Sequence, residues 1–433
     1  MRRRESVREY LGAALWVLPF LAGNVALLVG FTVASIEPAP GSWLEAFAFR
    51  GSSVQARELL VAITGTVVTV IALVLGLSVV ALQLTSTQFS PRLLRNFLRD
   101  RPNQVVLSVF MATFAYSAAG LFTVGVGADT ETFPRLAVSG AIALLFVSMA
   151  AVVYFADHLS HSIQVDAIMQ RVQGDALRVA RRLPDEIADD VPAPAPWAVP
   201  VPARLSGYVD TAHPELLLPV AVEHRVSITL TRRVGEHVVA GTPLALVWTP
   251  YEDDPPPDAH AIERALDQAV GIGFERTRQQ DVAIGIRQLV DVASKALSPA
   301  VNDPYTAVQA VDHLAVIFAT LAVRPLGPQV GRSGGVVVVV PSRRFGEYLA
   351  TMCGLVRRAG GREPTVMAAL LRLLETCAYA ARDDAQRLDD IEAQVRLVVV
   401  SAEQATADEG DVAPVQAAAG LILEAIEAYR PRG

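Results

Sequence analysis

Four long apolar segments occupy the first 156 residues, and they constrain the fold more than any other feature of the chain. Each has about the 20 apolar residues that a helix needs to cross the core of a bilayer. None contains Asp, Glu, Lys, Arg or His, and the segments are Leu11–Ser35, Leu59–Leu84, Val105–Val126 and Leu136–Phe155. We therefore expect four transmembrane helices in residues 1–156 and no crossing after them.

The distribution of arginines predicts the orientation of these helices. Loops that stay in the cytoplasm carry an excess of Lys and Arg. The first segment is too long for a signal peptide, and no small-x-small cleavage site follows it. The two basic clusters are Arg2, Arg3, Arg4 and Arg8 before the first segment, and Arg92, Arg95, Arg99 and Arg101 between the second and third. Both termini are therefore predicted to be cytoplasmic.

The second segment carries a stripe of small and neutral polar residues. At 100° per residue its members fall within about 60° of one another on a helix. They are Gly65, Thr69, Ala72, Gly76, Gln83 and Thr87. The third segment repeats the pattern more weakly with Thr113, Ser117 and Gly120. Such a stripe is typical of close helix packing in lipid, or of a helix that lines a water-filled path.

Charge-free spans exclude some transport mechanisms. Proton relays and many ion-coupled carriers place acids or bases inside the membrane, and these segments have none. A passive conduit and a simple anchor both remain open. Arg92, Arg95 and Arg99 recur at helical spacing after the second segment. They fit an interfacial helix against anionic headgroups, or a basic ring at the cytoplasmic mouth of an oligomer.

The rest of the chain is predicted to be a cytoplasmic α+β part. Its acidic balance argues against nucleic acid as a partner. Cys353 and Cys377 are interpreted as reduced core thiols. Residues 157–202 are predicted to form a helix and a Pro/Ala-rich linker, 203–250 a small β module, and 259–433 a mainly helical domain. The fold class is thus an α-helical membrane protein with four transmembrane helices and this α+β part.

The β module resembles the barrel-sandwich domains of biotinyl and lipoyl carriers and of membrane-fusion adaptors. The resemblance lies in the alternating strand that begins at Arg225 and in the turns at Gly235 and Gly241. A carrier needs a lysine at its hairpin tip, but the one lysine of the chain is Lys295. Residues 203–250 are therefore predicted to serve in structure or docking, with no cofactor.

We expect the following helix to run from 259 to about 296, and Gly271–Gly273 allow a break in it. Polar residues gather near this helix. Its polar face spans roughly 80° and leads into a loop where Asp303 and Pro304 start the next helix. The set comprises Asp281, Gln288, Asp291 and Lys295 on the face, then Ser298, Asn302 and Asp303 in the loop. It fits a structural network, or a sensor site for a ligand or ion.

No catalytic or metal-binding motif accompanies this set. The sequence shows no nucleophile–base pair of the kind found in a catalytic triad, no P-loop and no set of four metal ligands. His158 and His161 could share one helical face but have no third clear ligand. The sequence therefore predicts neither an enzyme nor a metal site.

Several motifs together resemble one large family of bacterial predicted membrane proteins with a domain of unknown function. The motifs are Phe89-Ser-Pro-Arg-Leu-Leu, Ser162-Ile-Gln-Val-Asp, Ser206-Gly-Tyr-Val, Gln280-Asp281 and Ser298-Pro-Ala-Val-Asn-Asp-Pro. The resemblance covers nearly the whole chain. It implies a multi-pass protein of the bacterial inner membrane and carries no activity, cofactor or catalytic residue.

Two functional hypotheses follow. The first is a homo-oligomer that conducts small ions or solutes passively, with the second segment lining the path and the cytoplasmic part assembling or gating it. The alternative is a non-conducting sensor or scaffold, whose cytoplasmic part binds a ligand or protein partner through the β module and the Asp281–Asp303 region.

Overall fold

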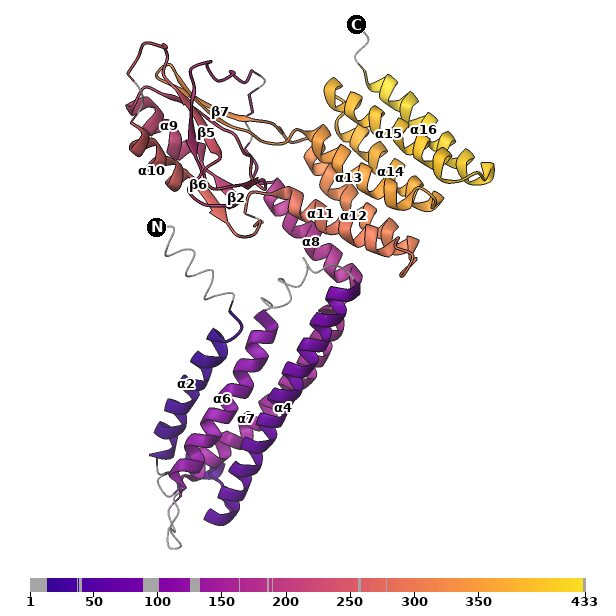
Figure 1. The fold of residues 1–433 in the computed structure, drawn as a ribbon. Coiled ribbons are helices and arrows are strands. Elements are labelled where there is room, and N and C mark those ends of the chain that lie inside the picture. The colour runs from indigo at the N-terminus through magenta and orange to yellow at the C-terminus, as the bar shows by residue number, and fades with distance from the viewer. Residues whose placement is uncertain are drawn as a thin grey trace. The chain divides into compact units, whose positions relative to one another are not determined.

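The computed structural model describes residues 14–36, 38, 41–88, 101–124, 133–162, 164–184, 187–188, 190–255, 258–277 and 279–430. The chain divides into two compact units, Met1–Ala167 and Ile168–Gly433. As the sequence predicts, the structure is mostly helical, with several apolar helices and a small sheet region (Figure 1).

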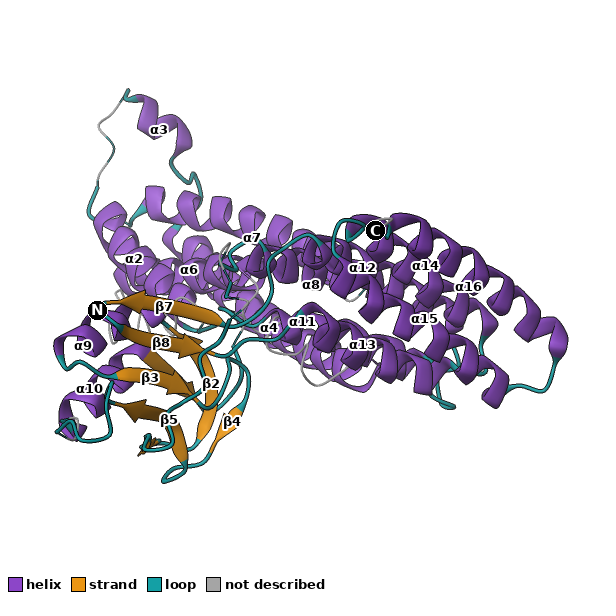
Figure 2. Ribbon diagram, turned by 90° about the horizontal axis from the view of Figure 1, so that it is seen from above, coloured by secondary structure: helices purple, strands orange, loops and turns teal. Residues whose placement is uncertain are grey.

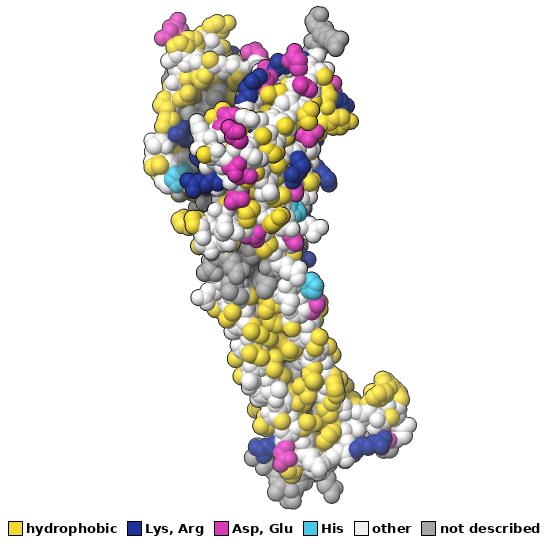
Figure 3. Space-filling view, turned by 90° about the vertical axis from the view of Figure 1, so that its right-hand side faces the viewer, with side chains coloured by type: hydrophobic (Ala, Val, Ile, Leu, Met, Phe, Trp, Pro, Cys, Tyr) yellow, Lys and Arg dark blue, Asp and Glu magenta, His cyan; other side chains and the backbone are white. Residues whose placement is uncertain are grey.

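Each apolar segment of the first unit coincides with a helix. Figure 3 shows hydrophobic side chains over much of the middle of this unit, as expected for helices whose outer faces contact lipid. The helices are α2 (Val17–Ala34), the short α3 (Trp43–Phe47), α4 (Ser53–Gln88), α6 (Arg101–Thr123) and α7 (Arg135–Ser162).

Helix α6 packs against α2, α4 and α7. Its contact with α2 is close because glycines lie at the crossing. A Cβ added at Gly23 would meet Met111 Cγ at 2.8 Å, and one added at Gly30 would meet the Cβ of Ala119 at 2.8 Å. Small residues let helix backbones approach in lipid, where packing rather than the hydrophobic effect drives association.

Six described helices are long and apolar enough to cross a membrane, two more than the sequence analysis expects. The additional two are α12 (Pro304–Ala322) and α16 (Glu409–Tyr429). The expectation that nothing after Phe155 could span is therefore wrong by length and composition. Apolar residues that face a protein core raise the hydropathy of a helix as much as residues that face lipid. Helix α12 illustrates this, since Val311, Leu314 and Phe318 are fully buried.

The helix predicted within residues 157–202 is divided between the end of α7 and a second helix, α8. Helix α7 ends at Ser162, and α8 runs from Val165 to Ala180. Helix α8 is amphipathic and buries Met169, Val172 and Ala176.

The sheet region of the second unit contains two sheets (Figure 2). One has the order β1-β5-β3-β8-β7 and the other β4-β2-β6. The β3–β8 pair is parallel and the other pairs are antiparallel. The strands are β1 (Val199–Pro202), β2 (Gly207–Ala212), β3 (Ser227–Leu230), β4 (His237–Val238), β5 (Pro243–Trp248), β6 (Val270–Gly273), β7 (Gln329–Ser333) and β8 (Val336–Val340).

The sheets draw on more of the chain than the predicted module of residues 203–250. Helices α9 (Pro214–Glu223) and α10 (Ala259–Ala269) share a core with the strands through Leu217 and Ile262. Strands β6, β7 and β8 come from beyond residue 250. Sequence patterns within 203–250 contain no signal for these partners, because strand pairing joins segments that are distant along the chain.

The expected helix over 259–296 is interrupted at the glycines where the sequence allows a break, and the interruption is longer than expected. Strand β6 and a turn separate α10 from α11 (Val282–Ala296). The glycines explain the change, because β6 approaches β2 too closely for side chains. A Cβ at Gly271 would lie 2.6 Å from Thr211 Oγ1, and one at Gly273 would lie 2.1 Å from Asp210 Oδ2. Glycine inside a strand often marks such an approach.

The C-terminal helices surround a second apolar core. Helix α14 contacts α12, α13, α15 and α16, and it buries Leu370, Leu373 and Leu374. The described residues of this part form six helices. They are α11, α12, α13 (Phe345–Gly360), α14 (Pro364–Ala380), α15 (Ala385–Ala405) and α16.

Candidate functional site

The stripe on α4 lies on the outside of the first unit. Gly65 and Gly76 are exposed, and a Cβ added at either would find no atom of the described chain within 4 Å. The hydroxyl of Thr69 is exposed and donates to the Gly65 carbonyl at 3.0 Å, within its own helix. Ala72 and Gln83 are exposed as well. The exposed residues of the stripe therefore face away from the described helices of their own unit.

The residues that α4 buries against its own unit lie on the opposite side. At 100° per residue, the centre of this buried set is about 180° from the centre of the stripe. The set is entirely apolar and comprises Ala56, Leu60, Ile63, Val67, Val74 and Ala81. Helix α4 thus packs into the unit with its apolar face and leaves its small, polar face for other contacts.

Four of the predicted residues cannot be placed. Arg92, Arg95 and Arg99, the predicted basic cluster, lie outside the described residues. The backbone of Thr87 belongs to α4, but its side chain lies outside the described part.

A second set of polar membrane residues faces the interior of the first unit. Gln104, Ser108 and Thr113 on α6 are buried. The hydroxyls of Thr113 and Ser148 lie 2.8 Å apart and join α6 to α7. The sequence analysis assigns Thr113, Ser117 and Gly120 to a weaker repeat of the α4 stripe and does not include Gln104 or Ser108 in this inward-facing set. The adjacent amides at the start of the segment, Asn103 and Gln104, were the signal that could have revealed it.

Some of these buried groups have no hydrogen-bond partner among the described residues. They are the Asn103 Oδ1, Gln104 Nε2 and Ser117 Oγ atoms. Each unpaired buried polar group costs about 1–3 kcal/mol. These three atoms therefore reduce the stability of the first unit, whereas the Thr113–Ser148 contact adds to it.

The predicted cytoplasmic polar set does not form one cluster. Asp281 caps the start of α11, and the loop with Ser298, Asn302 and Asp303 follows its other end. Fifteen residues separate them along the helix, which at 1.5 Å per residue is about 22 Å. Asp281 and Asp303 are thus too far apart to share a single ligand site.

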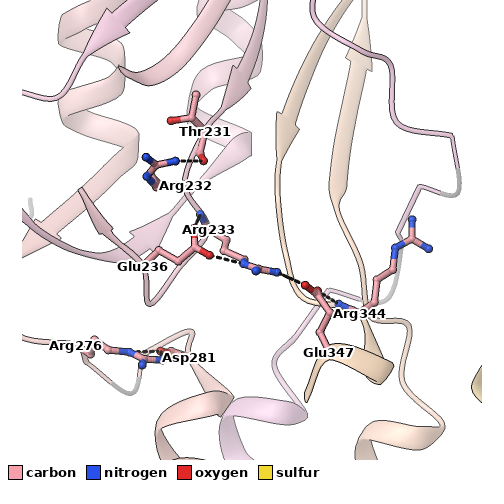
Figure 4. Close-up of polar contacts among 8 residues, drawn as sticks. All are labelled: Thr231, Arg232, Arg233, Glu236, Arg276, Asp281, Arg344 and Glu347. Atoms are coloured by element: carbon pink, nitrogen blue, oxygen red, sulfur yellow. Dashed lines mark hydrogen bonds and ion pairs between the residues drawn. The ribbon is translucent and has the colours of Figure 1, made fainter. Parts of the chain in front are cut away.

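Asp281 is held by several groups of its own chain, and Figure 4 shows its contact with Arg276. Its side chain is 4% exposed and accepts hydrogen bonds from Arg276 at 2.5 and 3.0 Å. The Ala283 N–H donates to its other oxygen at 3.0 Å. A Cβ at Gly235 would lie 2.3 Å from Asp281 Oδ2. The neighbouring Gln280 accepts a hydrogen bond from the Ala212 N–H of β2 at 2.9 Å.

A second ion-pair group joins the sheet region to α13. Arg233 donates to Glu236 at 2.7 Å and to both oxygens of Glu347 at 2.8 and 2.9 Å (Figure 4). Glu347 also accepts from the Arg344 N–H at 2.9 Å. Burial by itself would raise the pKa of Glu347, but hydrogen bonds from Arg233 and Arg344 outweigh it and lower the pKa. Burial, and then the charge of Asp281, raises the pKa of Tyr348 to about 12.

The remaining members of the set serve local contacts. Gln288 is 3% exposed within α11. Asp291 accepts from Arg287 Nε at 2.9 Å, a partner that the sequence analysis did not consider. Lys295 is half-buried, and its carbonyl accepts from the Ser298 hydroxyl at 2.6 Å.

The loop after α11 confirms the predicted helix start. Asp303 accepts from the Thr306 N–H at 3.1 Å and from its hydroxyl at 2.6 Å, and Pro304 is the first residue of α12. Asn302 is exposed and has a φ of +51°, a region that asparagine tolerates better than most residues.

The arrangement offers little reactive chemistry. Among the described residues, no group of three or more His, Cys, Asp and Glu side chains could hold a metal ion. Cys353 is fully buried, and burial raises the pKa of its thiol to about 12. His161 Nδ1 contacts the Asp157 carbonyl at 2.8 Å, one turn earlier in α7. The polar groups at the start of α11 therefore join the sheets to this helix, whereas those at its end make local contacts or cap α12.

Comparison with known protein families supports the interpretation of the chain as a membrane protein. Residues 13–376 match the family described as predicted membrane protein (DUF2254). The chain is 41% identical over 436 residues to the uncharacterized protein Mb1321c of Mycobacterium bovis, and equally to the uncharacterized protein Rv1290c of Mycobacterium tuberculosis. Each match covers 99% of this chain and 83% of the relative. No solved structure matches the chain.

Proposed function

The chain belongs to the DUF2254 family of predicted membrane proteins, and from this premise we propose that it is a homo-oligomer that forms a passive path for small ions or solutes. The path lies between copies of the chain in the bacterial inner membrane, along the outward face of α4. The cytoplasmic part assembles or gates the oligomer.

The position of the α4 stripe is the observation that carries this proposal. Gly65, Thr69, Ala72 and Gly76 face away from their own unit, so a second copy can approach them closely. Small residues favour such an approach, and a hydroxyl and glycine carbonyls can replace part of the hydration of a permeant species. The interior of the unit is less suitable, because Leu60, Phe110 and Tyr116 fill it.

Four crossings with both termini in the cytoplasm fit this proposal. Helices α2, α4, α6 and α7 have charge-free central stretches. Of the two further candidates, α12 buries eight of its residues and its Asp312 pairs with Arg372 at 3.2 Å. Helix α16 carries Glu424 and Glu427 near its end. We assign these two to the cytoplasmic part, and the basic clusters of the sequence set the orientation.

Proximity labelling tests the association of copies through α4. Ala72→Cys in the membrane is treated with a short bifunctional maleimide, and the matched control is Val153→Cys on α7, which is 71% exposed. The native thiols are buried. We expect covalent dimers from Ala72→Cys and none from Val153→Cys. Equal yields from the two variants would contradict the proposal.

Flux measurements separate conduction from the alternative. Purified protein in liposomes is exposed to voltage, membrane tension and osmotic gradients in turn. Flux of small ions or solutes above that of empty liposomes supports the path. A complete absence of flux, together with dimers from Ala72→Cys, would favour a membrane sensor or scaffold.

A further inference from the structure

The loop over residues 298–305 lies level with the N-terminal end of α8, and two hydrogen bonds fix this level. Gln173 of α8 contacts His313 of α12 at 2.5 Å, and Arg324 donates to the Leu183 carbonyl. The residue numbers in these pairs differ by 140 and 141, so α8 and α12 run parallel with a constant offset. The N-terminal end of α12, which starts at Pro304, is therefore level with the N-terminal end of α8.

The contact of α8 with α11 gives the same placement. A Cβ at Gly285, near the start of α11, would lie 2.6 Å from the Cβ of Ala176, near the end of α8. The start of α11 is thus beside the end of α8. Because α11 is followed directly by the loop and α12, the loop returns to the level at which α8 begins.

Two polar side chains of the loop make internal hydrogen bonds, and its apolar side chains are exposed. Ser298 donates to the Lys295 carbonyl, and Asp303 caps α12. Val301 is 46% exposed and Tyr305 is 78% exposed. Pro299, Ala300 and Asn302 are exposed too. The exposed surface of the loop is therefore mainly aliphatic and aromatic, with Asn302 as an exposed polar residue and the Asp303 carboxylate partly exposed.

A short connection joins α7 to α8. Helix α7 ends at Ser162 and α8 begins at Val165. Three Cα–Cα steps span at most about 11 Å. The start of α8 is therefore tethered within that distance of the end of α7.

We propose that the loop over residues 298–305 docks on the lipid headgroup layer. Tyr305 has the amphipathic ring that is enriched at membrane interfaces, and Val301 adds apolar area beside it. Lys295, in the last turn of α11, supplies a cation near anionic headgroups. The Ser298-Pro-Ala-Val-Asn-Asp-Pro motif thus has a role in positioning the cytoplasmic part on the bilayer, separate from any conduction along α4.

Site-directed fluorescence in the full chain tests this docking. Val301→Cys is labelled with an environment-sensitive dye and reconstituted in phosphatidylcholine–phosphatidylglycerol vesicles that contain a headgroup-level spin-labelled lipid. The matched control is Val323→Cys, which is 63% exposed and follows the other end of α12. A second label at Tyr305→Cys covers the case in which Val301→Cys folds poorly.

We expect the spin-labelled lipid to quench the dye at residues 301 and 305 several-fold more than at residue 323. Equal quenching at all three positions, or no quenching at residues 301 and 305, would overturn the proposal. A blue shift that grows with protein density but without lipid quenching would also overturn it, because the loop would then meet a second copy of the chain.

Discussion

At the scale of single residues, two glycines with the same backbone conformation have different surroundings. Gly235 has a φ of +88° and Gly241 a φ of +84°. A Cβ at Gly235 would collide with Asp281 and Arg276, whereas one at Gly241 would find no described atom within 4 Å. Gly235 is therefore the point at which the turn before β4 contacts the start of α11.

Substituting alanine at these two glycines separates backbone strain from contact. Gly241→Ala costs only the strain of a positive φ, about 1–2 kcal/mol. Gly235→Ala adds the collision with the Arg276–Asp281 pair, so we expect a lower apparent melting temperature than for Gly241→Ala. Differential scanning fluorimetry of the two purified variants measures this. Equal melting temperatures would show that Asp281 moves away at no cost.

Asp303 makes a prediction about pH. Hydrogen bonds from the Thr306 hydroxyl and N–H lower the pKa of the Asp303 carboxyl. Because the folded-state pKa is lowered, the contribution to stability is present above the ordinary value of about 3.9 and is lost as the pH falls through the folded pKa. Asp303→Ala removes an N-cap, which costs about 1 kcal/mol at neutral pH.

Thermal unfolding at two pH values checks this prediction. The melting temperature of Asp303→Ala should lie below that of the wild type at pH 7, and the difference should shrink on acidification. Asp303→Asn keeps an oxygen acceptor and should retain most of the stability at pH 7. A difference that does not change with pH would contradict a role for the ionised carboxyl.

At the scale of elements, α11 joins the two parts of the second unit. Its start is fixed to the sheets by Gln280 and Asp281, and its end leads into the loop that caps α12. The Asp303–Pro304 helix start could be predicted from sequence because capping is local. The position of Asp281 could not, since it depends on β6 pairing with the distant β2 and on Arg276, which is five residues away in a turn.

The Arg233–Glu347 pair tests how firmly the sheets are held on α13. The two side chains are 27% and 46% exposed, so solvent screens the pair and we expect a coupling of about 0.5–1 kcal/mol. Arg233→Gln, Glu347→Gln and the double variant form the cycle. Glutamine at 347 keeps an acceptor for the Arg344 N–H. A coupling of zero at low salt would assign the pair to the surface alone.

At the scale of the whole molecule, the two faces of α4 have different surroundings, because one packs into the first unit and the other is exposed. Hydrophobicity predicts where the four N-terminal helices lie, because a bilayer imposes length and composition on them. Their number in the membrane was harder to predict, since α12 meets the same criteria with residues that are buried in protein. Periodicity found the α4 stripe, but only the packing of Leu60, Ile63 and Val67 tells that the stripe faces outward.

Flux through liposomes tests whether the outward face of α4 lines a path. We compare the wild type with Thr69→Leu, which fills the stripe, and with Thr66→Leu, an equal substitution at an exposed threonine outside the stripe. We expect flux of small ions or solutes in the wild type and in Thr66→Leu, and we expect Thr69→Leu to lose this flux. Equal flux in all three proteins, or none in the wild type, would contradict a path along α4.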